Sequence, residues 1–182
     1  NQERYLGILI TTGGYKQTVL ANIEDRKSKG IGVATQIRQL MEGPVLRMVG
    51  KLETAMTLIQ GQLIPTLTYG FRAFLHLEPA DYKALNNMLK ECLEIILGCP
   101  ASTNLETMLN LVNNLHLEAW VDGLKLKYYS KKFHDHRNDT TKRTRLQQIW
   151  EFEMVNGVKG GLVEDLTKLS AKYNLPDVNI QR

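Results

Sequence analysis

Apolar residues recur at helical spacing along most of the chain. Between residues 45 and 63, successive apolar positions are four, three, four, three and four residues apart, which places them on one stripe of a helix. The stripe consists of Val45, Val49, Leu52, Met56, Ile59 and Leu63. Pro65 predicts that this helix kinks or ends near Ile64, because proline has no amide hydrogen to donate. Such a stripe is typical of a helix packed into a hydrophobic core.

Similar patterns predict helices on both sides of this one. Residues 18–29 and about 31–41 favour two helices, weakened between them by Gly30 and Gly32, and Gly43-Pro44 predicts where the second ends. Glu78-Pro79 predicts the start of a longer helix that Gly98 ends. Further helices are expected from a cap at Ser102 or Thr103 to Val112, over residues 117–137 and about 142–155, and around Leu162, Leu166 and Leu169.

Only the beginning of the chain favours a β-strand. Residues 5–12 are rich in β-branched side chains and are followed by Gly13-Gly14. A single strand is not stable alone, so we expect its partner to lie upstream. The patterns together predict a mainly α fold, a helical bundle with one short N-terminal edge strand.

The composition is that of an ordinary globular protein, with 43% hydrophobic and 23% charged residues. Apolar runs are short, so we expect no membrane span, and the opening Asn1-Gln2-Glu3-Arg4 contains neither a signal peptide nor an initiator methionine. We therefore expect a piece of a longer intracellular protein, in the cytoplasm, the nucleus or both. Cys92 and Cys99 are expected to be reduced thiols.

Charge is concentrated in one stretch. The net charge of the chain is +4, whereas residues 125–145 alone carry eight Lys or Arg and two Asp. The remaining residues are slightly acidic. A localised cationic stretch on an acidic body favours a polyanionic partner.

Part of this stretch falls on one side of the helix predicted over residues 117–137. Lys125, Tyr129, Lys132 and His136 are spaced by four, three and four, opposite an apolar stripe of Leu117, Val121, Leu124 and Tyr128. We expect the first set to face solvent, where the cations can meet phosphates and the tyrosine can stack on a sugar or base. Lys127, Lys131 and Arg137 flank it, and Lys142, Arg143 and Arg145 extend it. An ordinary lysine-rich solvated surface remains the alternative interpretation.

No catalytic constellation is predicted. A polymerase centre needs paired aspartates that hold two magnesium ions, and the chain contains no Asp-Asp pair. His134 and His136 are two residues apart, which on a helix points them to different faces. The glycine pairs lack the lysine or the βαβ context of phosphate-binding loops. We therefore expect no metal or cofactor site in this chain.

Three short motifs carry a family resemblance. They are Tyr5-Leu6-Gly7, Pro65 followed by Tyr69-Gly70, and Leu97-Gly98-Cys99-Pro100. Their order and intervals resemble the region after the polymerase centre of non-LTR retrotransposon reverse transcriptases, over about residues 4–135. Two positions depart from the family pattern: Phe74 stands where Trp is usual, and Glu94 where Arg is common, which puts a phosphate contact from that turn in doubt.

The resemblance implies three parts. Residues 1–17 would end the palm, with Tyr5, Leu6 and Gly7 as primer-grip residues; residues 18–137 would form a thumb-like helical domain; and residues 138–182 would be a helical C-terminal extension. By this resemblance the parent is an RNA-directed DNA polymerase. Its partners would be RNA, the RNA–DNA template–primer duplex and the fingers and palm of the same polypeptide, and magnesium would bind only in the missing catalytic domain.

Two other functions remain open from the sequence. The chain could be the thumb and RNA-binding extension of an intron maturase, which would bind intron RNA. It could also be a helical protein-interaction module whose apolar stripes bind a protein partner.

Overall fold

The structure, a computed structural model, describes residues 2–43, 50–74, 77–134, 145–159 and 161–175, without the side chains of residues 131–134 and 145–147. The chain forms two compact units. The first comprises Asn1–Phe71 and Glu78–Trp120, and the second Arg72–Leu77 and Val121–Arg182. The predicted mainly α fold is confirmed. The boundary between these two units falls inside a helix, and the predicted division into residues 1–17, 18–137 and 138–182 stays a prediction.

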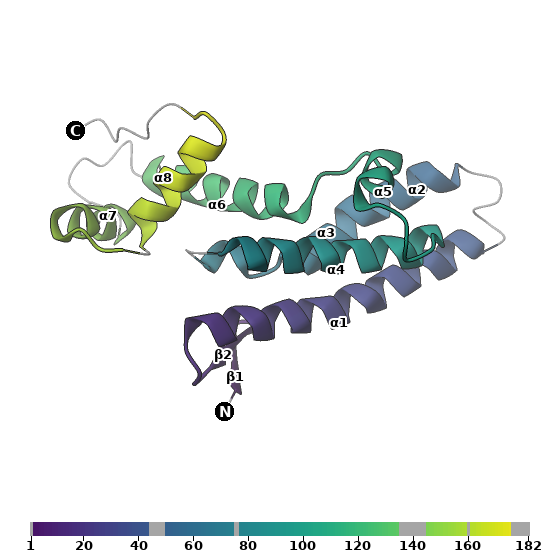
Figure 1. Cartoon of the computed structure of the whole chain (residues 1–182), viewed down its shortest axis with the longest axis horizontal. Coiled ribbons are helices and arrows are strands. Elements are labelled where there is room, and N and C mark those ends of the chain that lie inside the picture. The colour runs from purple at the N-terminus through teal and green to yellow at the C-terminus, as the bar shows by residue number, and fades with distance from the viewer. Residues whose placement is uncertain (1, 44–49, 75–76, 135–144, 160, 176–182) are drawn as a thin grey trace. The chain divides into compact units, whose positions relative to one another are not determined.

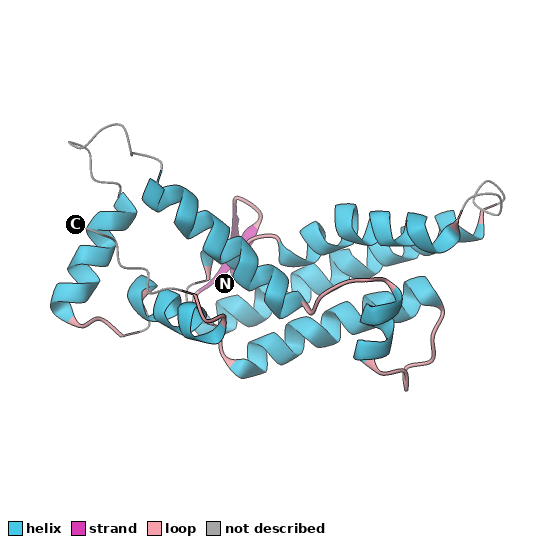
Figure 2. Cartoon of the chain, turned by 90° about the horizontal axis from the view of Figure 1, so that it is seen from above, coloured by secondary structure: helices cyan, strands magenta, loops and turns pink. Residues whose placement is uncertain are grey.

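A β-hairpin begins the first unit. Strand β1 (Gln2–Tyr5) pairs antiparallel with β2 (Ile8–Thr11), and these short strands are the magenta elements in Figure 2. The chain thus supplies the strand's partner itself, contrary to our expectation of a partner upstream. Tyr5-Leu6-Gly7 is correspondingly not the middle of a strand, since Leu6 and Gly7 form the turn.

One long helix follows the hairpin. Helix α1 (Tyr15–Glu42) runs through both glycines that were expected to separate two helices, and it ends at Gly43 as predicted. Gly30 is buried, and a β-carbon there would lie 2.3 Å from Cδ2 of Leu67 and 3.1 Å from Sγ of Cys92. The residue therefore permits close helix packing and does not break the helix.

The next helical stretch changes its winding ahead of Pro65. Helix α2 (Lys51–Leu58) passes into a π-helical segment, η2 (Ile59–Leu63), and then into α3 (Ile64–Thr68). The wider turn spares Pro65 the steric conflict with the preceding turn that it would meet in a regular α-helix. The stretch continues to Thr68, and its winding changes just before Ile64, where the sequence predicted a kink or an end.

Helix α4 (Pro79–Leu97) packs beside α1, as Figure 1 shows. Its start is fixed by a capping box between Glu78 and Asp81, and its end by Gly98 in the left-handed conformation, both as the sequence indicated. Its buried face consists of Leu85, Met88, Leu89, Cys92, Leu93 and Ile96. The short α5 (Leu105–Leu111) follows, capped by Asn104 and not by Ser102 or Thr103.

The second unit has a small core of its own. It contains most of α6 (Leu117–His134) and of the short 3₁₀ segment η3 (Phe71–Ala73), together with α7 (Arg145–Asn156) and α8 (Leu162–Lys172). Tyr129 of α6 is packed with Leu162, Leu166 and Leu169 of α8. Glu153 of α7 accepts a hydrogen bond from the amide of Val163 at the start of α8.

Candidate nucleic-acid interface

The turn of the hairpin presents two apolar side chains to solvent. Leu6 (φ 47°) and Gly7 (φ 80°) both have positive φ, which is the signature of a type I′ turn. Gly7 suits this conformation, whereas Leu6 adopts it at a steric cost. The side chains of Tyr5 and Leu6 are 66% and 75% exposed. The predicted primer-grip residues therefore form an exposed hairpin tip, defined here as Tyr5, Leu6 and Gly7.

Helix α1 holds the hairpin through β2, the strand that lies against it. The side-chain amide of Asn22 accepts a hydrogen bond from the amide of Leu9 (2.9 Å) and donates one to the carbonyl of Leu9 (2.7 Å). The hydroxyl of Thr18 accepts from the amide of Thr11 (3.1 Å). These contacts satisfy main-chain groups of β2 that point away from β1, so α1 takes the place of a third strand.

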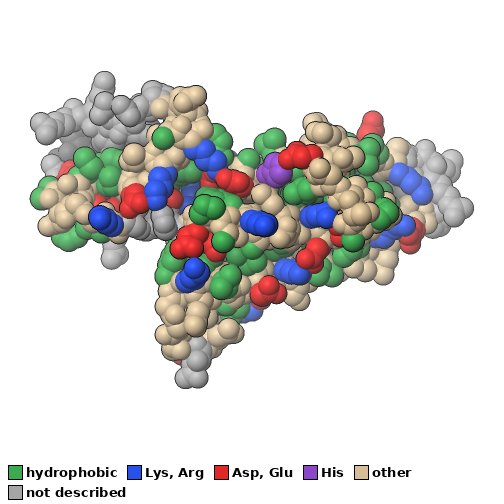
Figure 3. Space-filling model, in the orientation of Figure 1, with side chains coloured by type: hydrophobic (Ala, Val, Ile, Leu, Met, Phe, Trp, Pro, Cys, Tyr) green, Lys and Arg blue, Asp and Glu red, His purple; other side chains and the backbone are tan. Residues whose placement is uncertain are grey.

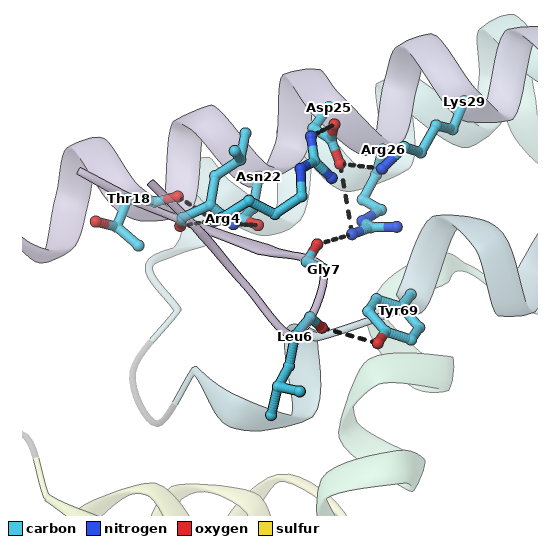
Figure 4. A network of polar contacts seen from close by, with 10 residues as sticks. Arg4, Leu6, Gly7, Thr18, Asn22, Asp25, Arg26, Lys29 and Tyr69 are labelled. Carbon is cyan, nitrogen blue, oxygen red and sulfur yellow. Dashed lines mark hydrogen bonds and ion pairs between the residues drawn. The ribbon is translucent and has the colours of Figure 1, made fainter. Parts of the chain in front are cut away.

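Two further side chains fix the hairpin tip itself. The buried guanidinium of Arg26 donates to the carbonyl of Gly7, and the hydroxyl of Tyr69 donates to the carbonyl of Leu6 at 2.9 Å, across 63 residues (Figure 4). The Arg26 guanidinium also lies 4.6 Å from the centre of the Tyr69 ring. The tip is therefore anchored by both α1 and the segment after α3.

A carboxylate completes this network. The carboxylate of Asp25 lies 2.8 Å from the guanidinium of Arg4 in β1 and 2.7 Å from the ammonium of Lys29 in α1. The guanidinium of Arg26 lies 3.4 Å from it. Burial alone would raise the pKa of Asp25, but the hydrogen bonds from Arg4 and Lys29 outweigh that effect and hold the pKa below its ordinary value. Asp25 thus neutralises cations that could otherwise bind phosphate.

The structure brings two of the three resemblance motifs together. Tyr69 contacts Leu6 and Gly7, and a β-carbon at Gly70 would lie 3.0 Å from Cγ1 of Ile8. The third motif, Leu97 to Pro100, lies at the other end of α1, where Arg38 reaches the carbonyl of Ile96 at 3.3 Å. The third motif ends α4 and is not part of the hairpin site.

The prediction that Lys125 and Tyr129 face solvent is wrong. Lys125 is 0% and Tyr129 2% exposed, and both bind Asp165 of α8 (Figure 1 shows the helices). The Lys125 ammonium lies 3.0 and 3.1 Å from the two carboxylate oxygens, and the Tyr129 hydroxyl donates at 2.9 Å. Neither side chain can reach a phosphate in this conformation.

The second unit contains two buried polar clusters, one around Asp165 and one around Asp122. Burial raises the pKa of Asp165, and the ion pair with Lys125 opposes that shift. Asp122, fully buried on α6, accepts from the ammonium of Lys172 (2.5 Å) and the hydroxyl of Tyr173 (2.9 Å). The polar residues of α6 therefore attach α8 to it.

The other members of the predicted stripe are distributed differently. Lys127 is exposed on α6. Lys131 and Lys132 belong to α6, and Arg145 begins α7, but their side chains lie outside the described part of the structure. His136, Arg137, Lys142 and Arg143 also lie outside the described residues. A cationic surface over residues 127–145 stays a prediction.

Cations of the first unit are largely paired within it. Lys16 lies 3.3 Å from Glu78, Lys27 2.8 Å from Glu91, and Lys90 3.3 Å from Glu94. On the face of this unit drawn in Figure 3, blue and red side chains are accordingly interspersed. The net electrostatic attraction of such a surface for a polyanion is weak.

The residues that position the tip were only partly recognised from the sequence. Thr18, Asn22 and Arg26 are spaced by four, so they share one face of α1 with Val19 and Ile23. Polar side chains at regular spacing beside a buried stripe are the signal that could have found them. Tyr69 was recognised as part of a motif, but its contact partner could not be read from the chain.

Among the described residues, no cluster of three or more His, Cys, Asp or Glu is arranged to bind a metal ion. None of the helices in the described ranges is both long and apolar enough to cross a membrane. Comparison of the chain with models of protein families, with curated proteins and with solved structures found no match.

Proposed function

We propose that this chain is the thumb region of a retroelement reverse transcriptase and that it holds the template–primer duplex behind the polymerase centre. The observation that carries the proposal is the contact of Tyr69 with Leu6 and Gly7. It joins two sequence motifs of the resemblance and leaves Tyr5 and Leu6 exposed on an anchored turn. Because the backbone of the turn is already held, its aromatic and apolar side chains can stack on a sugar or base at a reduced ordering cost.

Phosphate binding is assigned to the cationic stretch rather than to the first unit. Arg4, Lys16, Lys27, Lys29 and Arg38 are each engaged by a carboxylate. Lys125 is engaged by Asp165. The proposed contacts therefore come from Lys127 and the basic residues from Lys131 to Arg145. Shape rather than base sequence would be recognised, because phosphate contacts carry no sequence information.

Catalysis is assigned to the rest of the parent protein. With no Asp-Asp pair in the sequence, nucleotide incorporation and the magnesium ions it requires belong to the fingers and palm. The chain alone should bind duplex and incorporate no nucleotide.

The experiment is a fluorescence-anisotropy titration of a labelled RNA–DNA duplex at about 50 and 200 mM salt. Leu6→Asn should weaken binding because it removes the exposed apolar side chain. The turn itself should be kept, since Asn-Gly is well suited to type I′ turns. Lys127→Glu with Lys131→Glu should lower the salt dependence by roughly one unit of slope per lost phosphate contact. Lys51→Glu with Lys83→Glu, an equal charge change at exposed residues of α2 and α4, is the matched control. A folded chain that does not bind duplex at low salt would refute the proposal.

A second candidate is a helical protein-interaction module. It is favoured by α7, where Phe152 and Val155 are 62% and 84% exposed and Ile149 lies on the same side of the helix. Isolated exposed apolar residues are common, but several on one helix suit a protein partner. Absence of duplex binding, together with a protein partner whose binding is lost in Phe152→Ser, would favour this candidate.

A further inference from the structure

The two edges of the hairpin differ in their hydrogen bonding. In a hairpin with a two-residue turn, Tyr5 and Ile8 exchange main-chain hydrogen bonds, as do Glu3 and Ile10. The amides and carbonyls of Gln2 and Arg4 therefore point outward from β1, as those of Leu9 and Thr11 do from β2. Asn22 and Thr18 bind the β2 side. No side chain in the described part of the chain binds the outward groups of β1.

Nothing described covers this edge. All four residues of β1 are exposed. The Arg4 side chain reaches Asp25 of α1, on the β2 side of the hairpin, and so leaves the edge open (Figure 4). Open strand edges are templates for pairing with another strand, and proteins commonly cover or charge them.

The side chains of β1 indicate which strand fits. Glu3 and Tyr5 share one face with Ile8 and Ile10. Among the described residues, no cation lies within ion-pair distance of Glu3. In an antiparallel strand added to this edge, the residue opposite Glu3 would form a non-hydrogen-bonded pair with it. The side chains of such a pair approach each other closely. A cation there would complement Glu3, and an apolar residue two positions away would cover Tyr5.

A second copy of β1 fits this edge poorly. If two copies of β1 pair antiparallel at this edge, the residues whose main-chain groups point outward, Gln2 and Arg4, have to lie opposite one another or opposite themselves. Registers that pair most of β1 set Glu3 against Glu3 or Arg4 against Arg4, and like charges directly opposite are destabilising. The edge thus suits a different strand.

We propose that β1 is a docking edge for an extended segment of a partner protein, which adds as an antiparallel strand and carries Lys or Arg opposite Glu3 and an apolar residue beside Tyr5. This inference rests on the hairpin alone and is independent of duplex binding.

The test is an NMR titration of the full chain with two blocked peptides, Thr-Val-Thr-Lys-Thr and Thr-Val-Thr-Glu-Thr. The lysine peptide should shift the Gln2 and Arg4 amides, slow their exchange with solvent, and bind roughly tenfold more tightly than the glutamate peptide. In Glu3→Lys the glutamate peptide should bind more tightly than the lysine peptide. A variant whose hairpin had only unfolded would not show this reversed preference. Gln2→Pro removes one outward donor at an edge position that tolerates proline and should weaken binding; Gln2→Ala, which keeps the donor, should not.

Three results would overturn the proposal. The first is the absence of shifts at Gln2 and Arg4 at millimolar peptide. The second is equal binding of both peptides by the wild-type chain and by Glu3→Lys. The third is a dimer in sedimentation that Gln2→Pro dissociates, which would assign the edge to a second copy.

Discussion

Gly30 of α1 packs directly against Leu67 of α3, with space for a hydrogen atom but not for a methyl group. A β-carbon at residue 30 would lie 2.3 Å from Cδ2 of Leu67, whereas one at Gly32 would meet nothing within 4 Å. Two glycines in the same helix thus have opposite structural consequences.

Gly30→Ala should destabilise the protein by about 1–3 kcal/mol, because Leu67 or the helices must move. Gly32→Ala is the matched control and should be neutral or stabilising by up to about 1 kcal/mol, because alanine favours a helix interior. Urea unfolding followed by circular dichroism measures both. Equal destabilisation by the two variants would contradict this packing.

Lys125→Met should destabilise the second unit by about 3–5 kcal/mol, since it leaves the Asp165 carboxylate buried without its cation. Lys127→Met, two residues away on the exposed side, should change stability by less than about 0.5 kcal/mol. Thermal unfolding distinguishes them. Adding Asp165→Leu to Lys125→Met should recover much of the lost stability, because it removes the buried carboxylate that has no cation. If the double variant is as unstable as Lys125→Met, the Lys125–Asp165 ion pair is not what holds α6 to α8.

Asp25 should make the hairpin sensitive to acid. Its folded-state pKa is lowered by Arg4 and Lys29 against the opposing effect of burial. The stability it contributes is therefore complete above its unfolded pKa of about 3.9 and is lost as the pH falls through the folded value. The difference in unfolding free energy between wild type and Asp25→Asn should shrink as the pH falls below about 4. Arg4→Gln should shift that loss to higher pH, and a difference that is constant with pH would refute the assignment.

The two cysteines should differ in reactivity. Burial raises the pKa of the Cys92 thiol to about 12, so almost no thiolate is present at neutral pH, whereas Cys99 is only half-buried. In Cys99→Ser, labelling with a thiol reagent at pH 8 should require unfolding, while Cys92→Ser should label rapidly. Fast labelling of Cys92 in the folded protein would show that the contact of α1 with α4 opens.

The sequence predicted most helices because their periodicity and end signals are local. Its errors have identifiable physical causes. Between Ala55 and Leu67 the buried residues are Ala55, Ile59, Leu63, Ile64 and Leu67, and this stretch contains a π-helical segment that no local pattern announced. The regular α-helical spacing assumed from the sequence placed Leu52 on the buried stripe, but it is exposed.

The candidate site was predictable only in part, for a related reason. Tyr5 and Leu6 were named through a motif, yet their anchoring depends on Arg26 and Tyr69, which are distant in sequence. Lys125 and Tyr129 were assigned to a solvent face because lysine is rarely buried unless paired. Their partner, Asp165, is 40 residues from Lys125, and no local pattern indicates the pairing.

The bond pattern between β2 and α1 also determines how this chain can be divided. A side-chain amide that both donates and accepts presents the same groups as a neighbouring peptide unit, so Asn22 substitutes for a missing strand. A cut between residues 17 and 18, the boundary that the sequence suggested, would separate Leu9 and Thr11 from the groups that satisfy them. Any chimera or graft that is to keep the turn rigid has to carry the hairpin together with α1 as far as Arg26.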